Sequence, residues 1–279
     1  MCKSGQMESN NLFGSMTTTP RKNLPIFYLL DTSGSMTGEP IAILNRAMTE
    51  TMDALKKVAK KNSDAKLQIA VMEFNSNVKW MQPNGLEDVE DFYWVDLQAA
   101  GLTEVGAALK ELDSKLSRES FLNGIMGNLM PVIIIMTDGG ATSSYKKELN
   151  EIKKNKWFQN ASKIGFAVGN DADIDMITDV VGNSEAVIRT DDMETFAKLI
   201  KLASVTASKI GSVSRTSASG DISEEIVKTV TDNNTVKSSD TGNQSTKGNV
   251  DPDPASYPYP NPGDDDSISV DAWDEDEFD

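Results

Sequence analysis

The chain has 279 residues, with 27 Lys and Arg against 43 Asp and Glu, no His and one Cys, so its formal net charge is -16. Without histidine there is no imidazole for a catalytic triad, for a general base near neutral pH or for a zinc site, and a single thiol excludes an intrachain disulfide. A bound metal would therefore be held by oxygen atoms, which favours Mg²⁺, Mn²⁺ or Ca²⁺ over zinc.

The first half of the chain alternates apolar runs with helical periodicity, which is typical of a mostly parallel sheet covered on both faces. Pro40 suits the first turn of a helix, and continuously apolar runs suit strands buried on both faces. In order, the pattern predicts a strand at 25–31, a helix at 39–58, a strand at 67–74, a turn at 75–77 and a short antiparallel edge strand at 78–80.

The second half continues the same alternation after a loop at 81–102. The acidic residues at 171–175 lack the Gly and Glu of a calcium loop and are typical of a helix N-terminus instead. The elements predicted here are a helix at 103–116, strands at 131–136 and 164–168, a helix at 173–181, a strand at 186–188 and a final helix at 193–210.

This order of elements predicts a doubly wound α/β domain at 24–211, with a mostly parallel six-stranded sheet, one short antiparallel edge strand and helices on both faces. Residues 1–23 are expected to form a flexible lead. Residues 212–279 are rich in Ser, Thr, Pro, Asp and Glu, which predicts a disordered acidic tail with one short helix at 222–230.

Most of the negative charge lies in the tail, because residues 216–279 contain 16 acidic residues and three basic ones, against 27 and 24 in the remainder. The nearly neutral body has no basic stripe, which argues against a nucleic-acid partner. No apolar run approaches the roughly 18 residues needed to cross a bilayer, and the first residues do not form a signal peptide. We therefore expect a cytoplasmic protein that does not act at a membrane.

The end of the tail combines acids with large apolar residues, namely Ile268, Val270, Trp273 and Phe278. Acidic runs of this kind are commonly solubilising chain. The apolar residues also fit a docking peptide, and a tethered acid could instead serve as an internal ligand for a metal. The sequence leaves these three interpretations open.

Three short segments place oxygen donors at one predicted end of the sheet. Asp31-Thr-Ser33-Gly-Ser35 follows the first strand, Thr103 begins the second long helix, and Asp138 follows the strand at 131–136. Each segment alone is also typical of a turn or a helix cap. Ligands of open α/β sheets bind outside the carboxyl ends of the strands where strand order reverses, and hydroxyls and carboxylates suit Mg²⁺. Together the segments predict a metal site.

The same residues resemble the metal-ion-dependent adhesion site (MIDAS) of the von Willebrand factor A domain, in which Asp-x-Ser-x-Ser is completed by a Thr and an Asp from two further loops. The resemblance covers about residues 24–210. It implies a divalent cation, Mg²⁺ first, and a protein partner whose Asp or Glu completes the coordination shell. The metal ligands that it implies are Asp31, Ser33, Ser35, Thr103 and Asp138.

Residues 24–40, LPIFYLLDTSGSMTGEP, further resemble the A-domain protein of bacterial tellurium-resistance operons. That subfamily implies a stress-response setting with a protein kinase and a PP2C-type phosphatase as partners. Some of its members carry a C-terminal Cys/His metal-binding module, whereas this chain has an acidic tail there.

Three functions are compatible with these features. The first is a non-enzymatic, metal-dependent binding module that scaffolds an intracellular complex. The second is an assembly subunit for an AAA+ ATPase, as in metal-chelatase-like systems, which would use the same metal site. The third is an Mg²⁺-dependent phosphatase of the haloacid dehalogenase type, but that chemistry needs an Asp two residues after the nucleophile, where this chain has Ser33.

Overall fold

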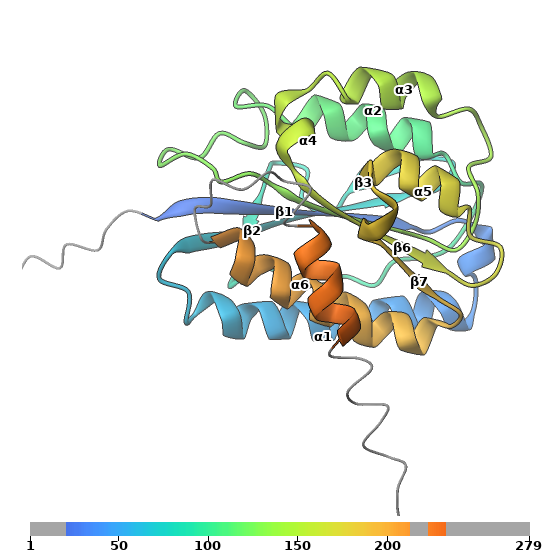
Figure 1. Ribbon diagram of the computed structural model, residues 1–279, viewed down its shortest axis with the longest axis horizontal. Coiled ribbons are helices and arrows are strands. Elements are labelled where there is room, and N and C mark those ends of the chain that lie inside the picture. Colours follow the sequence, from blue (N-terminus) through green and yellow to red (C-terminus); the bar gives the residue numbers. More distant parts are fainter. Residues whose placement is uncertain (1–20, 213–222, 233–279) are drawn as a thin grey trace, which may run out of the picture. The chain divides into compact units, whose positions relative to one another are not determined.

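The computed structural model describes residues 21–212 and 223–232, which form a sheet between two layers of helices (Figure 1). The strands are β1 (Lys22–Asp31), β2 (Ala65–Phe74), β3 (Val78–Trp80), β4 (Glu87–Asp88), β5 (Val132–Thr137), β6 (Ser162–Val168) and β7 (Val187–Thr190). The helices are α1 (Glu39–Ala59), α2 (Val105–Lys115), α3 (Lys146–Ile152), α4 (Lys156–Asn160), α5 (Ile174–Val181) and α6 (Met193–Ser212), together with 3-10 turns at Gly34–Met36 and Ser184–Ala186 and a helix at 223–232.

The sheet has the strand order β3-β2-β1-β5-β6-β7, and the strands from β2 to β7 along this path are parallel. β1 is central, pairing with β2 along its whole length and with β5 from Ile26 to Leu30. Strand order therefore reverses between β1 and β5, which confirms the predicted doubly wound fold. The carboxyl ends of these two strands define the crevice in which such folds bind ligands.

The sheet contains seven strands, one more than the sequence predicted. β3 is the predicted antiparallel edge strand, and β4 adds a second antiparallel pairing to β2, between Gln68 and Asp88 and between Ile69 and Glu87. The Asp88 carboxylate accepts a hydrogen bond from Gln68 and forms an ion pair with Lys66. A two-residue strand held by such contacts has no apolar alternation, so the sequence pattern does not reveal it.

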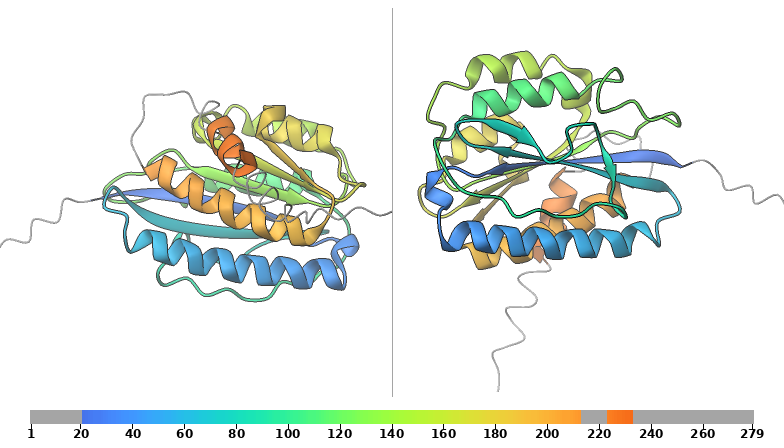
Figure 2. Two further views of the ribbon diagram at one scale, coloured as in Figure 1. Left: turned by 60° about the horizontal axis from the view of Figure 1, so that its bottom comes forward. Right: turned by 180° about the vertical axis from the view of Figure 1, so that it is seen from behind.

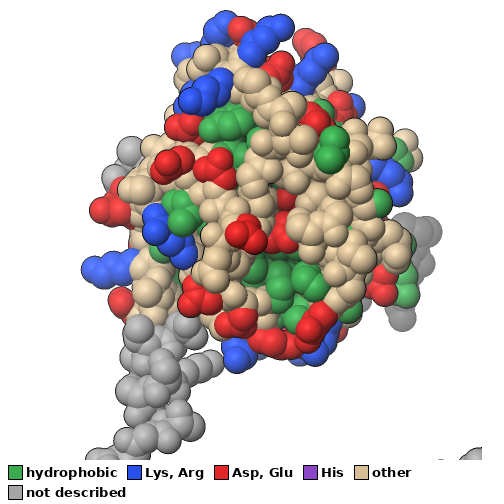
Figure 3. All heavy atoms as spheres, turned by 90° about the vertical axis from the view of Figure 1, so that its right-hand side faces the viewer, with side chains coloured by type: hydrophobic (Ala, Val, Ile, Leu, Met, Phe, Trp, Pro, Cys, Tyr) green, Lys and Arg blue, Asp and Glu red, His purple; other side chains and the backbone are tan. Residues whose placement is uncertain are grey.

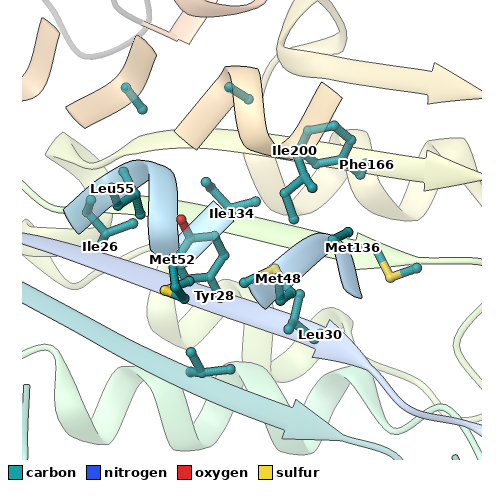
Figure 4. Packing of buried hydrophobic residues seen from close by; sticks show 14 of the residues in the cluster. Ile26, Tyr28, Leu30, Met48, Met52, Leu55, Ile134, Met136, Phe166 and Ile200 are labelled. Carbon is teal, nitrogen blue, oxygen red and sulfur yellow. The ribbon is translucent and has the colours of Figure 1, made fainter. Parts of the chain in front are cut away.

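Each face of the sheet has its own hydrophobic core. Along β1, Ile26 and Tyr28 point toward α1 and α6, whereas Phe27 and Leu29 point toward α2 and α5. Figure 4 shows the first of these cores, in which Tyr28 lies among side chains of α1 and its neighbouring strands, and Figure 2 shows α1 and α6 side by side beneath the sheet. Two-sided burial explains why the central strands are continuously apolar.

Two short helices, α3 and α4, lie between β5 and β6, where the sequence predicted no element. Most of their residues are polar, and they contribute Leu149, Ile152 and Phe158 to the core. Three apolar residues spread over two short helices do not make a clear 3.6-residue period. Their position is therefore decided by packing against α2 and the sheet.

The helix at 223–232 confirms the short helix predicted at 222–230. Its Ile226 and Val230 are fully buried in the core that contains α6, and the Ser223 hydroxyl accepts a hydrogen bond of 3.0 Å from the backbone amide of Lys163. That amide lies in β6 just before β7 joins the sheet at Gly165, so the helix satisfies a donor at the sheet edge. The predicted flexible lead and the other tail residues lie outside the described ranges.

Candidate metal site

Asp31 ends β1 and is completely buried. Its Oδ1 accepts a hydrogen bond of 2.8 Å from the backbone amide of Ser33, and its Oδ2 accepts one of 2.5 Å from the hydroxyl of Thr137, at the end of β5. One oxygen is thus fixed by the loop that follows β1 and the other by the end of β5, at the point where strand order reverses. The carboxylate is oriented before any ligand arrives.

A chain of hydrogen bonds joins this loop to the end of β5. The hydroxyls of Ser33 and Ser35 lie 3.0 Å apart, and the Ser35 hydroxyl donates to Oδ1 of Asp138 at 2.9 Å. Ser33 is buried, Asp138 is half-buried and Ser35 is exposed. The four oxygen-bearing residues from Asp31 to Asp138 therefore lie together at one end of the sheet, open to solvent on one side.

Thr103 reaches the same place from the loop before α2. The Gly34 amide donates to the carbonyl of Gly101 at 2.9 Å, which fastens this loop to the Asp-Thr-Ser-Gly-Ser segment. Gly101 has φ of +78°, and a Cβ there would lie 2.5 Å from Oγ of Ser76, so the loop needs glycine at this position. Two hydrogen bonds join Thr103 to Thr142, which follows β5. The Thr103 amide donates to the Thr142 hydroxyl, and the Thr142 amide donates to the Thr103 carbonyl. The structure thus brings together all five residues that the sequence selected.

Thr103 is 7% exposed, and its hydroxyl makes no hydrogen bond to any residue that the structure describes. Its backbone groups are satisfied by Thr142, so the loop geometry does not require this hydroxyl. A nearly buried hydroxyl with no protein partner is a suitable oxygen donor for an external group.

The electrostatics of the site favour a cation. Burial raises the pKa of the carboxyls of Asp31 and Asp138, and the neighbouring charges of Asp138 and Asp171, respectively, raise them further. Neither carboxylate forms an ion pair with a Lys or Arg of the described chain. A buried carboxylate beside a half-buried one, with no basic partner, is costly unless a positive charge compensates them. The donor set therefore fits a divalent cation.

Three residues of this region were not assigned a role at the metal site from the sequence. Thr137 fixes Asp31, Thr142 fixes Thr103, and Asp171 adds negative charge beside Asp138. Thr137 directly precedes Asp138 and follows the predicted strand at 131–136, and this position was the only sequence feature that could have indicated its contact with Asp31. Asp173 caps α5 by accepting a hydrogen bond from the Met176 amide, as the acidic run predicted. Within the described residues, no group of three or more Asp, Glu or Cys side chains is placed so that it could hold a metal ion by itself.

Figure 3 shows the end of the domain at which the parallel strands finish. Acidic side chains lie near the centre of this face and along its rim, with apolar patches between them and basic side chains mainly at the periphery. Leu102, directly before Thr103, is 53% exposed. The face thus combines an acidic centre with exposed apolar contact area.

The fold is shared with solved proteins of low sequence identity. Proximal thread matrix protein 1 of the mussel byssus is 21% identical (TM-score 0.52; 65% of this chain, 47% of that chain), and one of its structures is described as having a zinc-occupied MIDAS motif. A von Willebrand factor type A protein from Catenulispora acidiphila is 16% identical (TM-score 0.51; 67% and 43%). The pilus adhesin SpaC of Lactobacillus rhamnosus GG is 12% identical (TM-score 0.51; 66% and 30%).

The alignments cover less than half of each of these larger proteins. No curated protein matches the sequence. In the described ranges, no helix is both long and apolar enough to cross a membrane. The profile of the von Willebrand factor type A domain matches residues 26–203, which is more than half of the chain. The chain therefore belongs to the von Willebrand factor type A domain family.

Proposed function

We propose that this protein is a metal-dependent protein-binding module in which Asp31, Ser33, Ser35, Thr103 and Asp138 hold a divalent cation. The observation that carries the proposal is the pair of carboxylates, Asp31 buried and Asp138 half-buried, that lack a basic partner among the described residues and lie beside oriented hydroxyls. When bound, the cation supplies a Lewis-acid position for an oxygen ligand from outside. The partner's Asp or Glu is the natural occupant of that position.

The charge of the donor set explains why such a site binds a partner instead of only storing metal. Asp31 and Asp138 carry two formal negative charges, which a divalent cation just balances. The three hydroxyls of Ser33, Ser35 and Thr103 add no charge, so the bound ion stays attractive to a further carboxylate. The zinc-occupied MIDAS described for the mussel relative supports a divalent cation, and the all-oxygen donor set supports Mg²⁺ ahead of Mn²⁺ or Ca²⁺.

The environment of Asp31 argues against the phosphatase alternative. A nucleophilic carboxylate must reach phosphorus, but Asp31 is completely buried and both its oxygens accept hydrogen bonds. Ser33 stands where the acid/base Asp would be needed, and its hydroxyl lies against that of Ser35. We therefore propose a non-enzymatic role, for which the simple check is the absence of Mg²⁺-dependent hydrolysis of p-nitrophenyl phosphate.

The narrower proposal concerns the partners. The resemblance of residues 24–40 to the tellurium-resistance subfamily supports a cytoplasmic, bacterial stress-response complex that includes a protein kinase and a PP2C-type phosphatase. An AAA+ ATPase remains the alternative partner, because it would engage the same metal site. Affinity capture with excess Mg²⁺ and with EDTA, followed by identification of the proteins whose recovery depends on the metal, distinguishes these assemblies.

The metal site is tested by thermal or chemical unfolding at increasing Mg²⁺ concentration. At a hundredfold excess over Kd, a bound ion should raise the free energy of unfolding by about 2.7 kcal/mol. Asp31→Ala and Asp138→Ala should remove this metal-dependent increase while the domain still folds, because the hydrophobic cores do not include these carboxylates.

Asp171→Asn is the matched control, because Asp171 is an exposed acid beside Asp138 that is not in the proposed ligand set. It should retain most of the increase. An increase that persists in both alanine variants, or that is lost equally in the control, would contradict the assignment of the ligands.

A further inference from the structure

A pocket at the start of β6 contains a half-buried lysine. The pocket encloses about 240 Å³ between α4, β6 and the C-terminal end of α5, and Lys163 lines it. The strand register places Lys163 level with Phe27, four residues before Asp31, so the pocket lies about 13 Å from the metal site along the strands. The apolar residues that line the pocket are Phe158, Ala161, Val180, Val181 and Ala186.

Two backbone carbonyls fix the amino group of Lys163. Its Nζ donates to the carbonyl of Phe158 at 2.9 Å and to that of Ala161 at 3.1 Å, and both residues line the pocket. A neutral amine has two N–H groups and one lone pair, so these carbonyls accept both N–H groups of the neutral form. The lone pair then occupies the remaining tetrahedral position at Nζ. Loss of the proton therefore leaves no donor without a partner.

The charges around Lys163 disfavour its ammonium form. The lysine forms no ion pair with a residue that the structure describes, and Glu224, near the pocket, accepts a hydrogen bond from the Asn183 side chain instead. Burial, with the charge of Lys153 as a second cause, lowers the pKa of Lys163 to about 8. The two carbonyls and the Phe158 ring, whose centre lies 4.9 Å from Nζ, attract an ammonium group but carry no full negative charge.

This environment activates an amine as a nucleophile. Lysine becomes nucleophilic near neutral pH when it is desolvated in an apolar pocket or lies next to another cation, and Lys163 meets both conditions. At pH 8 its neutral fraction is roughly a hundredfold larger than that of an exposed lysine. Because the amine lines a pocket, a small molecule with an electrophilic carbon can approach it there.

The size and the chemistry of the pocket select the electrophile. Its volume corresponds to that of about eight water molecules, which suits a chain of roughly four to six carbon atoms. Its apolar walls favour an alkyl chain over a charged group. An aldehyde meets both requirements, because it joins an electrophilic carbonyl carbon to an alkyl chain and loses only water when it reacts with an amine.

We propose that Lys163 is a covalent binding site for small aliphatic aldehydes. Nζ attacks the carbonyl carbon, a C–N bond forms, and one amine proton passes to the carbonyl oxygen to give a carbinolamine. The second amine proton leaves with the hydroxyl as water, and the C=N bond of an imine forms. Neither step needs an oxidant, a reductant or a metal ion.

The test compares the rates at which single lysines of the full chain are alkylated. The protein is treated with butanal and sodium cyanoborohydride at pH 7.5 in the presence of EDTA, and the reduced butylamine adducts are located by peptide mass spectrometry. Lys163 should react at least tenfold faster than Lys156, an exposed lysine on α4. Glycolaldehyde, which is small and polar, should show a smaller preference for Lys163 because it does not use the apolar walls.

Three variants test the cause of the reactivity. Lys153→Gln removes the neighbouring positive charge and should lower the rate at Lys163 at least twofold, and Lys153 is exposed, so its replacement leaves the core intact. The matched control, Lys156→Gln, should leave that rate unchanged. Lys163→Gln should remove the fast adduct while the slow adducts of exposed lysines persist. Circular dichroism of each variant checks that the fold is retained.

Three results would overturn the proposal. One is an equal rate at Lys163 and Lys156, which would show that the pocket does not activate the amine. A second is the same preference for butanal over glycolaldehyde at Lys163 as at exposed lysines, which would show that the pocket does not hold the alkyl chain. The third is an unchanged rate at Lys163 in Lys153→Gln. Since the reaction runs in EDTA, these results are independent of the metal-site assignment.

Discussion

At the scale of single residues, Asp31 and Lys163 lie at opposite ends of the sheet and differ in how the protein compensates their charges. Asp31 has its oxygens fixed but no compensating cation within the described chain. Lys163, at the start of β6, donates from Nζ to the carbonyls of Phe158 and Ala161 at 2.9 and 3.1 Å and lies 4.9 Å from the centre of the Phe158 ring. The lysine is satisfied by dipoles of the protein, whereas the carboxylate leaves a charge for a ligand to balance.

The environment of Lys163 predicts a pH dependence of stability. Burial, with the nearby charge of Lys153 as a second cause, lowers the pKa of Lys163 to about 8, compared with roughly 10.4 for an exposed lysine. Between these two values the unfolded chain binds more protons than the folded chain, so this group makes the free energy of unfolding rise as pH increases from 8 toward 10.

Urea unfolding at pH 7, 8.5 and 9.5 checks this sign by comparing the wild type with Lys163→Gln. The advantage of the wild type should grow with pH, because only the wild type has the titrating amine. Lys228→Gln, which changes an exposed lysine on the helix at 223–232, should show no such trend. A constant difference between wild type and Lys163→Gln over the three pH values would contradict the prediction.

At the scale of elements, α5 packs closely on β6. Gly165 lies in β6, and a Cβ at this position would lie 2.2 Å from Cγ2 of Ile177 in α5. Side chains cannot approach so closely, so the helix takes this position only because residue 165 is glycine. The loop before α5 carries Asp171 and Asp173, and the Asp173 amide donates to the carbonyl of Gly139 beside the metal site. Packing of α5 therefore helps to position one wall of that site.

Gly165→Ala should destabilise the domain by about 1–3 kcal/mol, because the added methyl group overpacks the contact. Ile177→Ala alone should cost about 2–5 kcal/mol through the cavity it leaves, but the double variant should cost less than the sum of the two. Gly139→Ala is the control, since no atom lies within 4 Å of its added Cβ. Chemical denaturation of the four proteins measures the coupling, and strict additivity would show that α5 moves freely away from β6.

At the scale of the whole molecule, the core on the α1 and α6 face extends beyond the region matched by the family profile. That match ends at residue 203, whereas Ile226 and Val230 are fully buried in the same cluster as Phe196 and Ile200. The helix at 223–232 therefore completes the hydrophobic core on this face of the sheet. The domain boundary predicted at residue 211 stays a sequence-based prediction. It can be tested by comparing the stability of proteins that end at different residues.

Removing the contacts of this helix should lower stability. Ile226→Ala should reduce the free energy of unfolding by about 2–5 kcal/mol, as expected for a buried isoleucine, whereas Lys228→Ala on the exposed side should change it by no more than about 0.5 kcal/mol. A protein ending at Ser212 should be destabilised at least as much as Ile226→Ala. Equal midpoints of denaturation for the wild type and Ile226→Ala would show that the helix does not pack as described.

The sequence by itself determined the order of the main strands and helices and all five candidate ligands. Burial on both faces of the sheet leaves continuous apolar runs, and the Asp-x-Ser-x-Ser segment is local in the chain, so both features can be seen without coordinates. Only the tertiary structure decided the pairing of β4, the packing of α3 and α4, the partner of Ser223 and the unpaired state of the Thr103 hydroxyl. These features depend on contacts between residues far apart in the chain, which local periodicity does not record.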